Sequence, residues 1–204
     1  MGIVVSVNVG RVRDVEWGPS AIDKRPVAGP VAINELGLDG DEQADRRNHG
    51  GPDQAVYAYA REDLDHFEGE LGRELRDGRF GENLTLRGVD VNGALLGERW
   101  RVGGALLEVR SPRVPCGKFK AWLDERGWVK RFAAEGRPGA YFRVLETGTI
   151  GAGDSVEIVD RPDGGVTVAE SLRAYYGDRE LLRRIVALER RSAKWDAVAE
   201  HYGA

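Results

Sequence analysis

The sequence predicts a mixed α/β fold that is mostly β, a bent β-barrel followed by a small segment of three helices. Three observations lead to this prediction. Apolar and polar residues alternate over most of the first three quarters of the chain, and glycine punctuates the alternating segments. Helical spacing replaces the alternation after "RPDGGV". We therefore expect a β domain over residues 1–162 and a three-helix extension over residues 166–204.

The alternating segments are expected to be strands. They cover residues 3–9, 31–36, 54–60, 82–88, 99–111, 141–148 and 154–160. The fifth segment holds Gly103 and Gly104 between two apolar arms, which predicts a hairpin turn. Many short strands separated by glycine favour a barrel or a strongly bent sheet.

Two helical segments interrupt the strands. In residues 61–78 the apolar residues recur at helical spacing near one face, namely Leu64, Phe67, Leu71 and Leu75. Residues 117–136 predict two short helices that are broken at Gly127.

The tail predicts three short helices with recognisable starts. Thr167 and Glu170 have the spacing of a capping box. Asp178 and Ser192 are expected to cap the second and third helices. Apolar residues of the tail can build a small core, namely Leu172, Tyr176, Leu181, Leu182, Ile185, Leu188, Trp195 and Val198.

Composition limits the partners. The chain has 204 residues, 41% hydrophobic and 31% charged, as in ordinary globular proteins. Its formal net charge of −4 argues against a nucleic-acid polymer as a partner. No apolar run approaches the ~20 residues that cross a bilayer, so we expect no membrane partner, and the first residues predict a strand rather than a signal peptide. A single cysteine excludes an internal disulfide and fits a reducing cytoplasm.

That cysteine, Cys116, lies in "RSPRVPCGKFKAW", where a strand is expected to give way to a helix. Proline has no amide hydrogen, so Pro112 and Pro115 should end regular strand pairing. The positive end of the following helix and the nearby cation Arg113 favour a thiolate, which is a nucleophile or a soft metal ligand. The alternative is a small buried hydrophobe.

A second candidate is the loop "LGLDGDEQADRRNHGGPDQAV". Its glycines let the backbone approach a ligand, and Asp45 could orient His49 through a ring N–H, as acid–base sites require. The alternative is a tight turn with solvated charges. The three histidines of the chain lack the paired spacing of a structural zinc site, so we expect no such site.

Two further stretches could bind an anion. "DGRFGENLTLRG" places Arg79 and Asn83 beside glycines and in front of a strand, and "AIDKRPVAG" places Lys24 and Arg25 before another. Each is also compatible with an ordinary charged turn.

Taken in order, these stretches resemble the molybdenum cofactor sulfurase C-terminal (MOSC) domain family. The resemblance rests on "DKRPV", "GLDGDEQADRRNHGGPDQAVYAY", "GRFGENLT", "SPRVPCGKF" and "GAYFRVLETGTIGAGDSVEIV", and covers nearly all of the first 160 residues. The tail is similar to the three-helix extension of bacterial stand-alone members. The resemblance implies a pyruvate-kinase-barrel-like β-barrel that holds molybdenum-molybdopterin (Moco).

The resemblance also implies roles for individual residues. Cys116, at the position of the PRxPC-like motif, would supply a thiolate ligand to molybdenum. Arg113 of the same motif would bind the cofactor. The closest counterparts of the family's other cofactor-binding residues are, by position, Lys24, Arg25, Arg79 and Asn83. Asp45 or His49 would supply protons to the departing oxygen.

The activity implied is the reduction of small N-hydroxylated compounds, such as hydroxylamino-purines. The chain has no cysteine cluster for iron–sulfur and no clear dinucleotide fingerprint, so electrons are expected from a separate reductase. One alternative is a carrier that delivers the cofactor or sulfur through a persulfide on Cys116. Another is a metal-free thiol enzyme with Cys116 as nucleophile and His49 as base. The sequence favours no particular oligomeric state.

Overall fold

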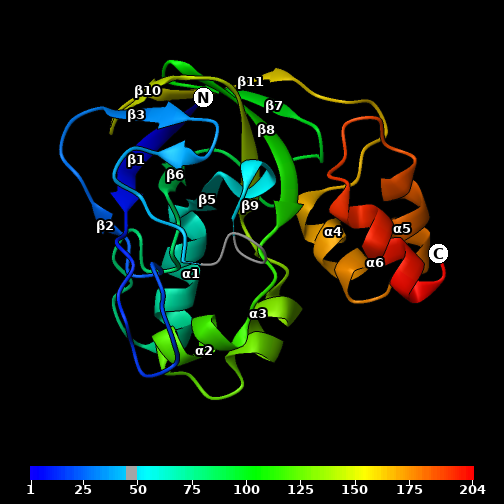
Figure 1. Cartoon of the computed structure of the whole chain (residues 1–204), viewed down its shortest axis with the longest axis horizontal. Helices are drawn as coiled ribbons and strands as arrows, with labels where there is room; N and C mark the ends of the chain where they lie inside the picture. The colour runs from blue at the N-terminus through cyan, green and yellow to red at the C-terminus, as the bar shows by residue number, and fades with distance from the viewer. Residues whose placement is uncertain (45–49) are drawn as a thin grey trace.

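Seven strands close into a barrel in the computed structural model, which describes residues 1–44 and 50–204 (Figure 1). They are β1 (Gly2–Val9), β5 (Val56–Ala60), β6 (Leu84–Arg87), β7 (Arg99–Val102), β8 (Ala105–Pro112), β9 (Ala140–Glu146) and β11 (Ser155–Asp160). Their order is β11-β7-β8-β9-β5-β6-β1, and β1 pairs with β11 to close the ring. Neighbours are antiparallel except β5 and β6, which are parallel. The predicted mostly-β, bent barrel is confirmed.

Shorter strands extend this architecture. β2 (Arg25–Pro26) pairs with the end of β1, and a separate small sheet contains β3 (Val31–Asn34), β4 (Gly37–Leu38) and β10 (Gly148–Ile150). The predicted strand over residues 141–148 is therefore two strands, β9 and β10. They separate because β9 pairs with β5 and β8 in the barrel, whereas β10 pairs with β3. The hairpin at Gly103 and Gly104 is confirmed, since β7 and β8 flank it.

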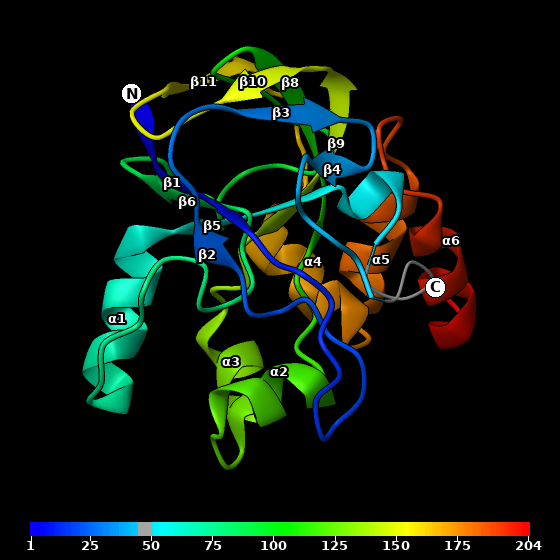
Figure 2. The same ribbon diagram turned by 60° about the vertical axis from the view of Figure 1, so that its left-hand side comes forward.

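The helices of the described residues lie outside the barrel (Figures 1 and 2). They are α1 (Arg61–Leu71), α2 (Gly117–Leu123), α3 (Trp128–Glu135), α4 (Val168–Tyr175), α5 (Arg179–Val186) and α6 (Lys194–Tyr202), with a short 3₁₀ helix η1 (Pro52–Gln54). The predicted break between α2 and α3 at Gly127 is confirmed. The prediction of a helix over residues 61–78 is wrong at its end, because Gly72 adopts a left-handed conformation with φ 63° and stops α1 there.

A second hydrophobic core lies beneath the barrel, between β5 and the helices α1, α2 and α3 (Figure 1). It is dominated by aromatic rings, namely Tyr57, Tyr59, Phe67, Phe80, Phe119, Trp128 and Phe132. Several of these rings meet edge to face, for example Phe80 and Phe119 with centroids 5.2 Å apart. This core fixes the position of α2, and therefore of the residues at its start.

The tail helices begin as predicted in two cases out of three. The capping box of Thr167 and Glu170 is present, and the Asp178 carboxylate accepts a hydrogen bond from the first turn of α5. The prediction that Ser192 caps α6 is wrong. Its hydroxyl instead donates to Asp53 Oδ2 at 2.6 Å, in the turn η1. The side chain is thus used to attach the tail to the barrel.

The core of the barrel continues into the tail. Val168, Leu182 and Trp195 belong to the same buried cluster as the inward-facing residues of the barrel strands. Tyr176, predicted to join the tail core, is instead 49% exposed. The division into residues 1–162 and 166–204 stays a prediction.

None of the helices within residues 1–44 and 50–204 combines the length and the apolar character that crossing a bilayer requires.

Candidate functional site

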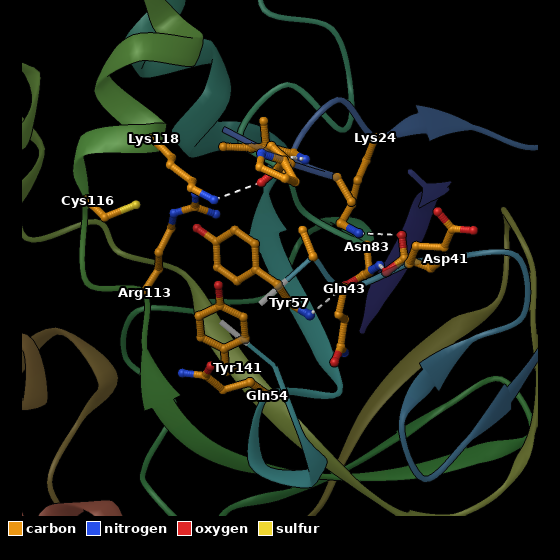
Figure 3. Close-up of a pocket in the computed structure, with 17 residues that line it drawn as sticks. Lys24, Asp41, Gln43, Gln54, Tyr57, Asn83, Arg113, Cys116, Lys118 and Tyr141 are labelled. Carbon is orange, nitrogen blue, oxygen red and sulfur yellow. Dashed lines mark hydrogen bonds and ion pairs between the residues drawn. The ribbon is translucent and has the colours of Figure 1, made fainter. Parts of the chain in front are cut away.

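An open cavity lies between the chain that precedes β2, the end of β8 and the start of α2 (Figure 3). Its empty space is about 680 Å³, open solvent at its mouth included, which is in the range of small-molecule sites. Polar and reactive side chains line it, among them Lys24, Asp41, Gln43, Gln54, Tyr57, Asn83, Arg113, Cys116, Lys118 and Tyr141.

Cys116 lies at the rim of this cavity. It is the residue before the first turn of α2, in extended conformation, and β8 ends at Pro112, so the predicted change from strand to helix is confirmed. The residue is half-buried and its side chain lines the cavity, so it is not sealed inside the hydrocarbon core. Figure 3 shows the sulfur on the same side of the cavity as Arg113.

Arg113 provides a buried cation beside the thiol. Its Nη1 donates to the Phe80 carbonyl at 2.7 Å, and its guanidinium lies 4.1 Å from the Phe119 ring centre and 5.1 Å from that of Tyr57. Burial works against its charge, but the electrostatic influence of Tyr141 and Tyr57 outweighs it, so the pKa of Arg113 is raised. Its buried Nε has no hydrogen-bond partner in the part of the chain that the structure describes. One N–H of a rigidly held cation thus remains to be satisfied.

A polar cluster forms the other end of the cavity. The Lys24 ammonium donates to Asp41 Oδ1, which also accepts from the Gly10 amide at 2.8 Å. Asp41 Oδ2 accepts from the Asn83 amide at 2.9 Å, and Asn83 Oδ1 accepts from the main-chain N–H of Tyr57 at 3.1 Å. Burial lowers the pKa of Lys24, and the Asp41 carboxylate opposes this shift. The cluster is therefore a neutralised ion pair with fixed donors and acceptors.

Two glycines allow the "GRFG" loop to lie against the main chain and side chains near Lys24. Gly78 and Gly81 have φ of 78° and 75°, in the left-handed region that favours glycine. A Cβ on Gly78 would lie 2.5 Å from the Lys24 carbonyl oxygen, and one on Gly81 would lie 2.9 Å from Ile22 Cγ1. The loop therefore supports the wall of the cavity that holds Lys24.

Glu82 holds that loop in place from behind, and sequence reasoning missed it. The side chain is fully buried and accepts hydrogen bonds from the main-chain N–H groups of Gly78 and Phe80 and from the Thr85 hydroxyl. Burial outweighs these hydrogen bonds and raises the pKa of Glu82 to about 7. Because the Phe80 carbonyl accepts from Arg113, Glu82 also helps to orient the guanidinium.

The structure brings together four of the residues that the sequence predicted for the site. Lys24, Asn83, Arg113 and Cys116 line the same cavity. Asp45 and His49 lie outside the described residues.

Arg25 and Arg79 do not line the cavity. Arg25 points to solvent and pairs with Asp23 at 2.8 Å. Arg79 lies over the Trp122 ring at 4.2 Å and donates to the Trp122 carbonyl at 3.1 Å.

Other lining residues were not predicted. Tyr57 and Tyr141 are opposite each other on β5 and β9, with ring centres 4.8 Å apart, and burial raises the pKa of both phenols. Gln54 is the last residue of η1, two residues before β5 begins. The sequence offered one signal for the two tyrosines: each stands at a core position of a strand, where its hydroxyl needs a polar neighbour.

A closed barrel with one thiol beside a cationic cavity agrees with the family match, in which the MOSC domain covers residues 45–157, more than half of the chain. The chain belongs to the MOSC domain family, and the resemblance inferred from its motifs is confirmed. It is 34% identical over 201 residues to YflK of Bacillus subtilis, covering 95% of this chain and 91% of that protein. The crystal structure of YiiM from Geobacillus stearothermophilus superposes with a TM-score of 0.85 at 32% identity and covers 100% of both chains. A protein of Gibberella moniliformis named reductase is 34% identical over 79% of this chain, which spans 30% of that protein.

Proposed function

We propose that this protein is a molybdenum-cofactor-dependent oxidoreductase that reduces small N-hydroxylated compounds, of the hydroxylamino-purine type, with electrons from a separate reductase. The observation that carries the proposal is the meeting of the Cys116 thiol and the buried Arg113 cation in one cavity. A soft ligand and a fixed cation that line the same cavity suit a metal with an anionic organic carrier.

The donors present fit molybdopterin. Cys116 offers the soft sulfur ligand, and the unsatisfied Nε of Arg113 offers a hydrogen bond within the same wall. Lys118 adds a cation at the mouth, where its ammonium now donates to the Pro19 carbonyl at 2.7 Å. The phosphate of the cofactor would be held at this cationic side. When bound, the cofactor would supply the two-electron reduction of an N–O bond, with an amine and water as products.

The remaining lining residues would orient the bound heterocycle and supply a proton to the reaction. Asp41 presents a carboxylate that Lys24, the Gly10 amide and the Asn83 amide hold in a fixed position, and an acceptor of this kind suits an N–H edge of a heterocycle such as a pterin or a purine. The phenol of Tyr141 is protonated at neutral pH, as an ordinary phenol is, and burial raises its pKa further, so a proton is held at Oη on the cavity wall.

The electron donor is proposed to be a second protein. The fungal reductase supports this, because the region similar to this chain makes up only 30% of its length and leaves room for a redox partner in the same polypeptide. We place the reaction in the cytoplasm, because a chain with a single cysteine forms no internal disulfide and fits a reducing compartment.

Metal and pterin analysis tests the proposal. Protein made in cells that synthesise molybdopterin is expected to contain about one molybdenum and one pterin per chain, and to reduce 6-hydroxylaminopurine when supplied with an artificial reductant. Cys116→Ser should lose the molybdenum, while Arg183→Gln on the exposed side of α5 should keep it. If the wild-type protein contains no molybdenum, the proposed reductase function is contradicted. A persulfide trapped on Cys116 in such protein would establish the carrier instead.

A further inference from the structure

Five arginines gather on one surface beside the cavity. They come from the chain before β2, from β2 itself and from the loop after α1. We call them the basic face: Arg13, Arg25, Arg73, Arg76 and Arg79. Two of them, Arg25 and Arg79, are the cations that the sequence predicted for the cofactor and that the structure places outside the cavity lining.

Three of these arginines share one carboxylate. Asp23 lies 3.7 Å from Arg13, 2.8 Å from Arg25 and 2.6 Å from Arg76. The Asp23 side chain is only 17% exposed, whereas those of Arg13 and Arg25 are 69% and 60% exposed. The negative charge is therefore recessed, and the positive charges around it face water.

The other two arginines continue the face along α2. Arg79 stacks on Trp122, and Arg73 donates to the Leu123 carbonyl and pairs with Glu125 at 3.1 Å. The pKa of Arg79 is lowered by its partial burial and by the positive charges of Arg73 and Arg76. The cations are thus close enough to repel one another, at a cost to the folded state.

The basic face adjoins the cavity. The Arg76 guanidinium donates to the carbonyl of Lys24, whose ammonium lies in the cavity. Trp122 lies on α2, six residues after Cys116, which immediately precedes that helix; six residues correspond to about 9 Å of helix length. In Figure 2 the chain before β2 runs down beside α2, and the hydrogen bond from Lys118 to Pro19 joins them.

We propose that the basic face docks an acidic surface of the electron-donating protein. This inference rests on the proposed function, which needs two electrons from the donor and two protons from water for each N–O bond reduced to amine and water. The donor leaves two electrons more oxidised. The net charge of the chain is −4, so this clustering of cations is local and steers an acidic partner to the edge of the cavity.

Charge reversal tests the inference. The variant Arg13→Glu with Arg73→Glu removes two exposed cations. Its control, Arg179→Glu with Arg183→Glu, makes the same change of charge on exposed positions of α5, which lies beside the barrel at the right of Figure 1, whereas α2 lies beneath the barrel. Molybdenum-loaded proteins receive electrons from photoreduced flavodoxin, an acidic flavoprotein, or from the cationic methyl viologen radical. Binding of a fluorescein-labelled icosaglutamate peptide and of a labelled 20-base-pair DNA is measured in parallel by anisotropy.

At 20 mM salt, the test variant is expected to react at least about tenfold more slowly with flavodoxin and to bind the peptide at least about tenfold more weakly. Its rate with methyl viologen should not fall, and the control should match wild type in every assay. Unchanged flavodoxin rate and unchanged peptide affinity in the test variant overturn the inference. Tighter binding of DNA than of peptide, lost in the test variant, overturns it in favour of a nucleic-acid surface. Absence of turnover with methyl viologen refutes the proposed function instead, and peptide binding then still decides whether the face attracts an acidic surface.

Discussion

Glu82→Gln is expected to remove a pH dependence from the stability of this protein. The pKa of Glu82 is about 7 in the folded protein, against 4.5 for an ordinary glutamate. As the pH rises through this window, the unfolded chain releases the proton first, so ionisation favours unfolding. The stability that the folded protein gains by holding this proton more tightly than the unfolded chain is fully present below pH 4.5 and is lost by about pH 7. At about 1.4 kcal/mol per pH unit, the loss from this one carboxyl is about 3 kcal/mol.

The amide cannot ionise, so the variant should lack this loss. It can accept hydrogen bonds only through its oxygen, and its NH₂ group then faces the main-chain N–H of Phe80, which now donates to the carboxylate at 2.9 Å. An unsatisfied buried N–H costs about 1–3 kcal/mol at every pH. The variant should therefore be less stable than wild type at pH 5 and about as stable, or more so, at pH 8.

Urea unfolding followed by tryptophan fluorescence measures the difference between pH 5 and pH 8. Contributions from the other carboxyls cancel when the two proteins are compared at each pH, and an unchanged m-value shows that the same surface is exposed. Stability curves of wild type and variant that stay parallel across this range would refute the reasoning, because they would mean that Glu82 titrates alike in both states.

Three further predictions concern the tail and the "GRFG" loop. Burial lowers the pKa of Lys194 to about 8, so its charge opposes folding at neutral pH. Lys194→Met should therefore raise the free energy of unfolding at pH 7 by roughly 2 kcal/mol, as measured by urea titration. This gain should shrink as the pH rises from 8 towards 10.5. Thr167→Ala should cost about 1 kcal/mol by the same assay, and an equal loss in Thr167→Ser would contradict a capping role. Gly78→Ala should lower the melting temperature and the pterin content, because the new Cβ would lie 2.5 Å from the Lys24 carbonyl oxygen. Gly69→Ala, where a Cβ meets nothing within 4 Å, is its control and should retain both.

Most strands could be predicted because a half-buried strand shows its alternation locally. The barrel itself was predicted, but the pair of strands that closes it could not be, since β1 pairs with β11 through Gly2 and Val156, which lie at opposite ends of the barrel sequence. Nor could the parallel pairing of β5 with β6, which alternation does not distinguish from an antiparallel one. The early end of α1 depended on Gly72, a residue that a helical pattern tolerates but that here adopts positive φ.

The candidate site was predictable where one short motif carries it. Cys116 and Arg113 are three residues apart, so the proximity of thiol and cation follows from the local sequence. Asp41 could not be assigned, because its contacts with Lys24 and Asn83 depend on how the barrel places three distant segments. Lys24 and Arg25 show the limit most clearly. The sequence treated these neighbours as one anion site, but one is buried in the cavity and the other is 60% exposed on the basic face.

The cavity and the basic face carry their positive charge in different surroundings, which would suit different ligands. Inside, Asp41 neutralises Lys24, so an anion gains little at that end, whereas Arg113 rests on a carbonyl and two aromatic rings and keeps its full charge beside Cys116. Outside, the arginines share a recessed carboxylate and present their charge to water, where salt screens it. A small anion that is stripped of water gains most at Arg113, because the interaction there is less screened. A large acidic protein cannot enter the cavity and meets only the exterior cations. On the proposed function, Arg113 would therefore bind the cofactor tightly inside the cavity, and the basic face would bind a protein partner transiently outside it.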